Sequence, residues 1–317
     1  MSRLAVFGYS EVGYRCLKTL LEDGADIAWV VTHRDNPAET RWYGSVADLA
    51  TSARLRVALY ESLAPDECLE TLRSLSPDFL FSFYFRHLLS ADVLATARRG
   101  ALNMHGSLLP AYRGRAPVNW AIIRGEARTG ASLHYMTDKP DAGDLVDQEP
   151  VPIGVDDTGL DVSLKVAEAA ARIVHRTLPA LVAGTAARRP QDLARGSYFS
   201  GRTAADGRID FSRRAWDVHN LIRAVAPPFP GAFGELAGVR LDLAGSRWVD
   251  EPAARPDLAP RLYGANDRLY LDCVDGRRLL ITRAAFGGQP LDAAALATHG
   301  GELRISVRAT RAGAQVS

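Results

Sequence analysis

The sequence predicts a doubly wound, mostly parallel α/β sheet, followed by a small antiparallel β-barrel of OB-like type. Three patterns predict this order: short apolar runs that alternate with helical stretches, one long amphipathic helix, and a final series of short β-like runs between Gly and Asp turns. Alternating strands and helices are typical of parallel sheets with crossover helices. Short strands separated by turns are typical of small barrels.

The chain starts with a predicted strand–helix–strand unit. Residues 4–7 form an apolar run that ends at Gly8, and residues 12–22 have helical spacing that ends at Gly24. Residues 27–31 are an uninterrupted apolar run with β-branched side chains, which indicates a second buried strand.

The same alternation continues along the first half of the chain. Strands are expected at residues 79–83, 101–105, 131–136 and 146–153, and helical stretches at 46–50 and 67–75. Ligands bind at the carboxyl ends of strands in such sheets. Asn103 and His105 lie at one of these ends.

The clearest helix spans residues 160–181, where apolar side chains recur every three or four positions. Pro179 is expected to kink or fray its last turn. Residues 184–211 are polar and rich in turn formers, and we interpret them as a connection between domains. A short helix is expected at 215–225.

The remaining chain predicts the second domain. Strands are expected at residues 232–236, 239–243, 269–273 and 278–283. We therefore predict a catalytic domain at 1–200, a barrel-like domain at 201–305 and a flexible tail at 306–317.

Composition excludes several classes of protein. The chain has 317 residues, 47% of them hydrophobic, and a net charge of +1, so nothing demands a nucleic acid or a membrane as partner. Its three widely spaced cysteines form neither a disulfide framework nor a metal knuckle. The first residues lack the pattern of a signal peptide, and no apolar run is long enough to span a bilayer. We expect a cytoplasmic protein.

Polar side chains gather in the segment that follows the strand at 101–105. Asn103 and His105 are two residues apart, so they share one face of a strand. An amide can donate to a developing oxyanion, an imidazole can move a proton, and a carboxylate can orient that imidazole. Asp138, Asp141 and Asp144 supply candidate carboxylates nearby in the sequence. These groups are those required to move an acyl-type carbon onto an amine.

Several remaining motifs have simpler structural interpretations. Residues 8–13 lack the second glycine of a dinucleotide fingerprint and the lysine of a phosphate-binding loop. The spacing of the aspartates does not fit a calcium loop, and no zinc pattern occurs, so we expect no metal. Ser107 is expected to order the turn rather than act as a nucleophile. The isolated histidines are interpreted as structural: His134, His175, His219 and His299.

The motifs resemble the folate-dependent formyltransferase family. The resemblance rests on Asn103-x-His105-Gly-Ser-Leu-Leu-Pro, Arg113-Gly-Arg-Ala-Pro and Asp141-x-Gly143, and it extends from the first strand to about Phe233. Segments 32–37, 42–47, 81–88 and 223–233 resemble the sugar branch, in particular the enzymes of polymyxin resistance that formylate UDP-4-amino-4-deoxy-L-arabinose. This implies a Rossmann-like catalytic domain and 10-formyltetrahydrofolate as the formyl donor.

The resemblance also implies roles for individual residues. Asn103 would stabilise the oxyanion, His105 would transfer the proton, and Asp141 would hold His105 and raise its pKa. The folate would lie near His87, Leu88, Leu89, Arg115, Thr137, Asp138, Lys139, Pro140 and Asp141. The diphosphate of the sugar nucleotide needs donors; Arg202 and the turn with Gly8 and Gly13 are candidates, although Arg202 is explained equally well as a surface residue.

The resemblance also implies the partners of the enzyme, and three alternative functions remain open. The formylated sugar would go on to modify lipid A, and a dehydrogenase on a separate polypeptide would act in the same pathway. Methionyl-tRNA formyltransferase is the nearest rival, but the charge of +1 and segments 36–37 and 43–46 count against it. Two rivals come from different classes of protein: a nucleotide-dependent oxidoreductase and a non-catalytic module that binds sugar nucleotides.

Overall fold

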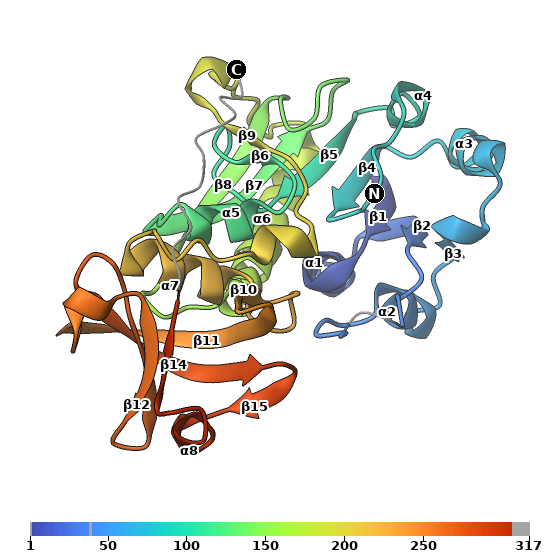
Figure 1. Cartoon of the computed structure of the whole chain (residues 1–317). Helices are drawn as coiled ribbons and strands as arrows, with labels where there is room; N and C mark the ends of the chain where they lie inside the picture. The colour runs from blue at the N-terminus through green and yellow to red at the C-terminus, as the bar shows by residue number, and fades with distance from the viewer. Residues whose placement is uncertain (1, 38–39, 306–317) are drawn as a thin grey trace. The chain divides into compact units, whose positions relative to one another are not determined.

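The computed structural model describes residues 2–37 and 40–305 (Figure 1), and the predicted tail at 306–317 lies outside these ranges. The chain divides into two compact units. The first comprises residues 1–121, 126–153 and 160–202, and the second comprises 122–125, 154–159 and the chain from Thr203 onward. Each unit is described separately below.

The first unit contains most of the α/β elements. In chain order they are β1 (Arg3–Gly8), α1 (Ser10–Glu22), β2 (Asp26–Thr32), α2 (Val46–Ser52), β3 (Val57–Leu59), α3 (Pro65–Leu75), β4 (Phe79–Phe83), α4 (Ala91–Leu94), β5 (Gly100–His105), β6 (Arg113–Gly114), α5 (Pro117–Ile123), β7 (Arg128–Tyr135), β8 (Leu145–Pro152), α6 (Gly159–Ala183) and β9 (Tyr198–Phe199). None of the helices among the described residues is long and apolar enough to cross a bilayer.

The strands form a mostly parallel sheet, as predicted. Its seven strands follow the order β3-β2-β1-β4-β5-β7-β8. The strands from β3 to β5 are parallel, whereas β7 pairs antiparallel with both β5 and β8. The short strand β3 was not predicted, because its apolar run is only three residues long and half-buried. The antiparallel β7 brings a further strand beside the end of β5 that carries Asn103 and His105.

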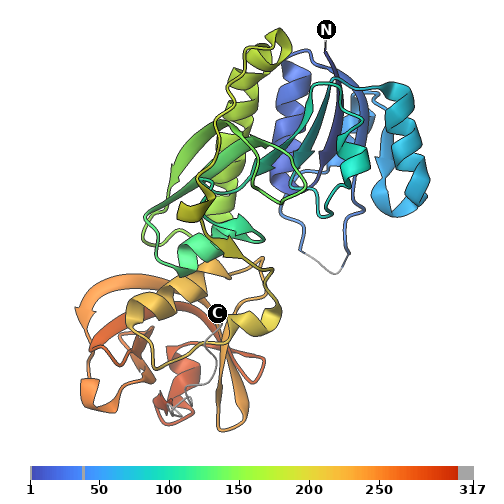
Figure 2. The same cartoon turned by 90° about the horizontal axis from the view of Figure 1, so that it is seen from above.

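Helices cover both faces of this sheet. Figure 2 shows α1 (blue) and α6 (yellow-green) on one face and α3 (light blue) on the other. On the α3 side, Phe7 and Trp29 pack with Leu72 in one buried cluster. The strands β1 and β4 are buried on both faces, which explains their nearly continuous apolar sequences.

The long helix α6 continues beyond Pro179 to Ala183, so of the two outcomes predicted for Pro179, a kink or a frayed last turn, the fraying does not occur. Proline removes its own N–H and leaves carbonyls of the preceding turn without partners. The guanidinium of Arg99 donates to the carbonyls of Leu181 and Val182 at the end of the helix. These bonds satisfy carbonyl groups that a helix end otherwise leaves free.

The second unit contains α7 and an antiparallel sheet. Its elements are α7 (Ala215–Ala224), β10 (Ala232–Leu236), β11 (Val239–Pro252), β12 (Arg261–Ala265), β13 (Arg268–Asp272), β14 (Arg277–Phe286), β15 (Gln289–Leu291), α8 (Ala293–Ala297) and β16 (Glu302–Arg304). The strand order is β10-β11-β14-β13-β12-β16, with β15 on β14. Register shifts along the pairing of β11 with β14 allow the sheet to curl. The predicted fold class is confirmed as a mostly parallel α/β sheet followed by a curled antiparallel sheet.

Helix α7 packs on β11 and β14 within the second unit. His219 on this helix is fully buried, and its ring nitrogens bond to the Ser246 hydroxyl and the Val155 carbonyl. Trp216 and Trp248 meet edge to face beside it, with ring centroids 5.1 Å apart. The interpretation of His219 as a structural histidine is therefore confirmed.

Candidate active site

The carboxylate of Asp141 lies beside the imidazole of His105 within the first unit. The distance from His105 Nδ1 to Asp141 Oδ1 is 3.4 Å. His105 is the last residue of β5, and Asn103 is two residues earlier on the same strand. The structure thus places all three predicted catalytic residues at the carboxyl end of β5, where ligands bind in open α/β sheets.

A backbone amide of β6 holds the side chain of Asp141 in place. The amide of Gly114 donates to Asp141 Oδ2 over 2.9 Å, while Oδ1 faces the imidazoles of His105 and His134. Burial opposes ionisation of this carboxyl, but the two imidazoles and the Gly114 amide outweigh it and lower the pKa of Asp141 to about 2. Asp141 is therefore a carboxylate at neutral pH.

The hydrogen bonds of His105 define which ring nitrogen is available for chemistry. Nε2 lies 2.8 Å from the carbonyl oxygen of Tyr112, which can only accept, so Nε2 carries a proton. Burial lowers the pKa of His105 below its ordinary value, although Asp141 and the Tyr112 carbonyl act in the opposite direction. In the neutral ring, the lone pair is then on Nδ1, beside Asp141.

Burial outweighs the effect of the Asp141 carboxylate on the pKa of His105. Asp141 does raise this pKa, as predicted, but the side chain of His105 is almost completely buried and desolvation is the larger effect. The consequence is a neutral imidazole at physiological pH that can accept a proton at Nδ1. The charge that it gains is then stabilised by the carboxylate 3.4 Å away.

Replacing Asp141 with asparagine is expected to move the acid limb of the pH–rate profile to lower pH. The carboxylate is the group that raises the pKa of His105, so its removal lowers that pKa further. Turnover at neutral pH is expected to fall roughly a hundredfold, because the protonated imidazole loses its counter-charge. The measurement is kcat/KM as a function of pH for the wild type and D141N.

The matched control is Asp144→Asn, three residues further along the same segment. Asp144 pairs with Arg188 at 3.8 Å. Its substitution is expected to leave the acid limb in place. An unaltered pH profile in D141N would remove Asp141 from the proton-transfer step.

His134 belongs to the site, although its isolated position in the sequence led to a purely structural interpretation. It pairs with Asn103 across the antiparallel β5 and β7 strands. Its Nδ1 donates to the carbonyl of Tyr135, so its Nε2 accepts from Asn103 Nδ2 at 3.2 Å. This bond uses one amide hydrogen of Asn103 and leaves the second for a substrate oxygen. Only the pairing register, which the sequence did not show, reveals this contact.

The turn after β5 is packed against its neighbours. A Cβ atom on Gly106 would lie 1.8 Å from the hydroxyl oxygen of Tyr84, so any other residue at this position would require the Tyr84 side chain to move. Ser107 Oγ donates to the carbonyl of Ala111 over 2.6 Å, and the hydroxyl of Ser132 donates to the carbonyl of Ser107. Ser107 therefore orders the turn, as the sequence predicted.

The residues expected to contact folate lie on three segments of the first unit. His87 and Leu88 are exposed after β4, and Leu88 has 80% of its surface exposed, whereas Leu89 packs against the buried cluster around Phe7. Met136 packs against that same cluster just before the second segment. The second segment holds Thr137, Asp138, Lys139, Pro140 and Asp141. The third segment holds Arg115, which follows Gly114, the donor to Asp141.

The three predicted contacts to the sugar nucleotide are dispersed. Gly8 and Gly13 face each other in the tight connection from β1 to α1, where a Cβ on Gly13 would lie 3.0 Å from the backbone of Gly8. Close packing therefore accounts for Gly13. The guanidinium of Arg202 lies over the ring of Trp120, 4.6 Å from its centroid. Trp120 also stacks on Phe199.

An amide, an imidazole and a carboxylate, groups that can stabilise an oxyanion and move a proton, thus lie together at the end of a parallel strand of an α/β sheet. A family model described as formyl transferase matches residues 2–178, and one described as its C-terminal domain matches residues 202–300. The chain belongs to the formyl transferase family and is a formyl-transferring enzyme. The likeness continues well beyond Phe233, where it was expected to fade.

Solved structures with the same fold include several sugar N-formyltransferases. The N-formyltransferase from Helicobacter canadensis, in complex with folinic acid and dTDP-3-aminofucose, has a TM-score of 0.73 at 18% identity, covering 92% of this chain and 100% of its own. WlaRD, a sugar 3-N-formyltransferase solved with dTDP and 5-N-formyl-THF, has a TM-score of 0.68 at 18% identity, covering 92% and 98%. A 4-N-formyltransferase from Francisella tularensis has a TM-score of 0.61 at 20% identity, covering 77% and 96%.

Proposed function

We propose that this enzyme transfers a formyl group from 10-formyltetrahydrofolate to the amine of a nucleotide-linked amino sugar. The observation that carries the proposal is the convergence of an amide, an imidazole and a carboxylate at the end of β5, with His105 Nδ1 3.4 Å from Asp141 Oδ1. The family assignment supports formyl transfer, and the folate and nucleotide ligands of the similar structures support the choice of donor and acceptor.

His105 performs the proton transfer in this proposal. The amine attacks the formyl carbon and must lose a proton as the new C–N bond forms. The lone pair on His105 Nδ1 takes this proton, and Nε2 keeps its bond to the Tyr112 carbonyl. The imidazole then gives the proton to the nitrogen that leaves with tetrahydrofolate, so the ring ends neutral. Asp141 stabilises the charged ring between the two steps.

Asn103 acts on the oxygen of the formyl group. Negative charge develops on this oxygen while the amine adds, and a fixed N–H donor stabilises it more than mobile water does. His134 holds the carboxamide of Asn103 in one orientation through its Nδ2. Because one hydrogen of Nδ2 is already bonded, the second has a defined direction.

The segments around the site suit a flat, partly apolar donor such as a folate. Leu88 exposes its apolar side chain to solvent directly after His87 in the chain, so it is accessible to a ligand. Thr137 and Lys139 form a turn in which the Thr137 hydroxyl bonds to the Lys139 backbone. We propose that these segments, with Leu89 and Arg115, hold the pterin and supply backbone groups to its polar edge.

For the acceptor, we propose UDP-4-amino-4-deoxy-L-arabinose. Segments 32–37, 42–47, 81–88 and 223–233 resemble the sequences of enzymes that act on this sugar. Arg202, stacked on Trp120, is the proposed contact to the diphosphate, together with the turn from Gly8 to Gly13. The product would serve lipid A modification and polymyxin resistance, and a dehydrogenase would supply the sugar precursor. The three buried, unpaired cysteines suit a cytoplasmic setting.

Incubation with 10-formyltetrahydrofolate and a panel of acceptors is expected to yield one formamide. The panel contains UDP- and dTDP-linked 3-amino and 4-amino sugars and methionyl-tRNA. Mass spectrometry of the sugar identifies the product, and absorbance of released tetrahydrofolate gives the rate. Formylation of the UDP-linked 4-amino pentose above the others supports the acceptor. Formylation of methionyl-tRNA alone would overturn the sugar assignment.

A further inference from the structure

We infer that Gln191 is a positioning residue that holds Asp141 against His105. The inference rests on the proton-transfer role proposed above for His105 and Asp141. Gln191 lies beyond α6, fifty positions from Asp141 in the sequence. Its side chain bonds to the backbone of the Asp141 segment, and its effect on the reaction passes through this backbone.

The side-chain amide of Gln191 holds this segment through two hydrogen bonds, which together are called the clamp. Its Nε2 donates to the carbonyl of Asp141 over 3.1 Å and to the carbonyl of Gly143 over 2.7 Å. Both amide hydrogens are therefore used, which fixes the orientation of the amide. Its Oε1 is buried and accepts no hydrogen bond from the described residues. A buried acceptor without a partner is costly, and the two donated bonds offset this cost.

The clamped backbone is strained at the catalytic carboxylate. Asp141 has φ of 54°, in the left-handed region that side chains other than glycine rarely adopt. Gly143 passes so close to β7 that a Cβ atom would lie 2.0 Å from the carbonyl oxygen of Tyr135. Such a conformation persists only when surrounding contacts hold it. Gln191 bonds to the carbonyls on both sides of Ala142, between these two residues.

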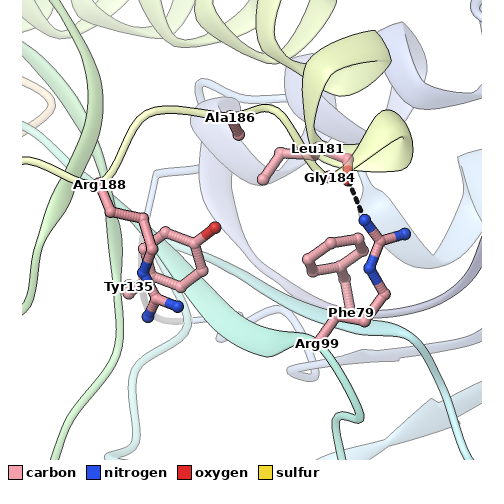
Figure 3. A pocket seen from close by; sticks show the side chains of 7 residues that line it. All are labelled: Phe79, Arg99, Tyr135, Leu181, Gly184, Ala186 and Arg188. Atoms are coloured by element: carbon pink, nitrogen blue, oxygen red, sulfur yellow. Dashed lines mark hydrogen bonds between the residues drawn. The ribbon is translucent and has the colours of Figure 1, made fainter.

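The segment that carries Gln191 is itself anchored to β7 and β8. The backbones of Arg189 and Leu145 exchange two hydrogen bonds of 2.8 and 2.9 Å. Figure 3 shows the guanidinium of Arg188 over the ring of Tyr135, at 3.8 Å from its centroid. Arg188 and Tyr135 border a cavity of about 180 Å³ that is also lined by Leu181 and Ala186. The backbone next to Gln191 is therefore held in place, and this fixes the position of its side-chain amide.

Loss of the clamp is expected to move the carboxylate away from His105. The Gly114 amide still holds Asp141 Oδ2, but the backbone beneath it is free to leave the left-handed conformation. The charged and titratable groups that face His105 are Asp141, which raises its pKa, and His134, which lowers it. A retreat of the Asp141 carboxylate therefore lowers the pKa of His105.

The test is Gln191→Ala in the full chain, with two measurements. NMR titration of the His105 ring, without any substrate, is expected to move to lower pH. Turnover is expected to fall about ten- to a hundredfold, since a small misplacement of a catalytic group has costs of this size. In the D141N background, Q191A is expected to cause no further shift and little further loss, because the clamp then has no carboxylate to position.

Gln148→Ala is the matched control. Gln148 also donates two hydrogen bonds inside the first unit, to the carbonyl of Leu109 and the hydroxyl of Ser132. It is expected to lower thermal stability without moving the titration of His105. If Q191A does not fold, Gln191→Met, which keeps much of the size and loses the donors without adding a charge, gives the same readout.

The outcomes separate this inference from the proposed function. Additive effects of Q191A and D141N, or an unmoved His105 titration in Q191A and Q191M, would overturn the positioning role. A shifted titration in a protein that formylates none of the acceptors would support the clamp and reject the proposed acceptors. The NMR measurement needs neither the formyl donor nor the amine acceptor, so it tests the positioning role of Gln191 even if the proposed acceptor is wrong.

Discussion

Replacing His105 with glutamine is expected to lower formyl transfer by roughly two to four orders of magnitude, the range that a positioned acid–base group contributes. Glutamine keeps an N–H donor for the Tyr112 carbonyl, which His105 Nε2 now satisfies. It has no lone pair of suitable basicity in place of Nδ1. The measurement is single-turnover formation of the formamide, with folding verified by thermal denaturation.

His175→Gln is the control for this substitution. His175 is exposed on α6, and its ring bonds to Asp23 at the end of α1. This variant is expected to keep wild-type turnover. The acid limb of the pH–rate profile should disappear in H105Q and remain in H175Q. A persistent acid limb in H105Q would assign the titrating base to another residue.

The position of Asn103 and His105 could be predicted because it depends on local periodicity. Two residues that are two apart on a strand share a face, and the carboxyl end of a parallel strand is exposed to ligands. The alternation of strands and helices was sufficient to place β5 in the sheet. The resemblance to a known family then singled out Asp141, which periodicity alone did not separate from Asp138 and Asp144.

His134 and Gln191 could not be predicted because their contacts depend on long-range geometry. His134 meets Asn103 through the register of the antiparallel β5–β7 pair, and a shift of one residue would turn it to the opposite face. Gln191 reaches the Asp141 segment from a part of the chain that is placed there by the bridge between Arg189 and Leu145, the first residue of β8. Neither residue stands in a motif, so no local pattern marks it.

The net direction of the pKa shift of His105 could not be predicted from the sequence either. A neighbouring carboxylate is visible in the sequence once a site is assumed, and its effect has a known sign. Burial is not visible, and the side chain of His105 retains only 7% exposure. Desolvation therefore reverses the net direction that the charge of Asp141 alone would produce.

Replacing Asn103 with alanine is expected to lower turnover on the order of 10² to 10³, the usual cost of removing one oxyanion donor. The donor acts mainly on charge that develops during the reaction, so kcat should fall while KM for both substrates changes little. Removal of the carboxamide also frees Nε2 of His134 from its bond to Asn103. The measurement is the separate determination of kcat and KM for donor and acceptor in the wild type and N103A.

Asn103→Asp distinguishes a donor from a space-filling side chain. Aspartate has nearly the same shape, but it offers no N–H group and places negative charge where negative charge develops. Its turnover is therefore expected to be at least as low as that of N103A. If N103D instead retained most of the wild-type turnover, the shape of the side chain would be sufficient. The oxyanion would then need its donor elsewhere at the end of β5.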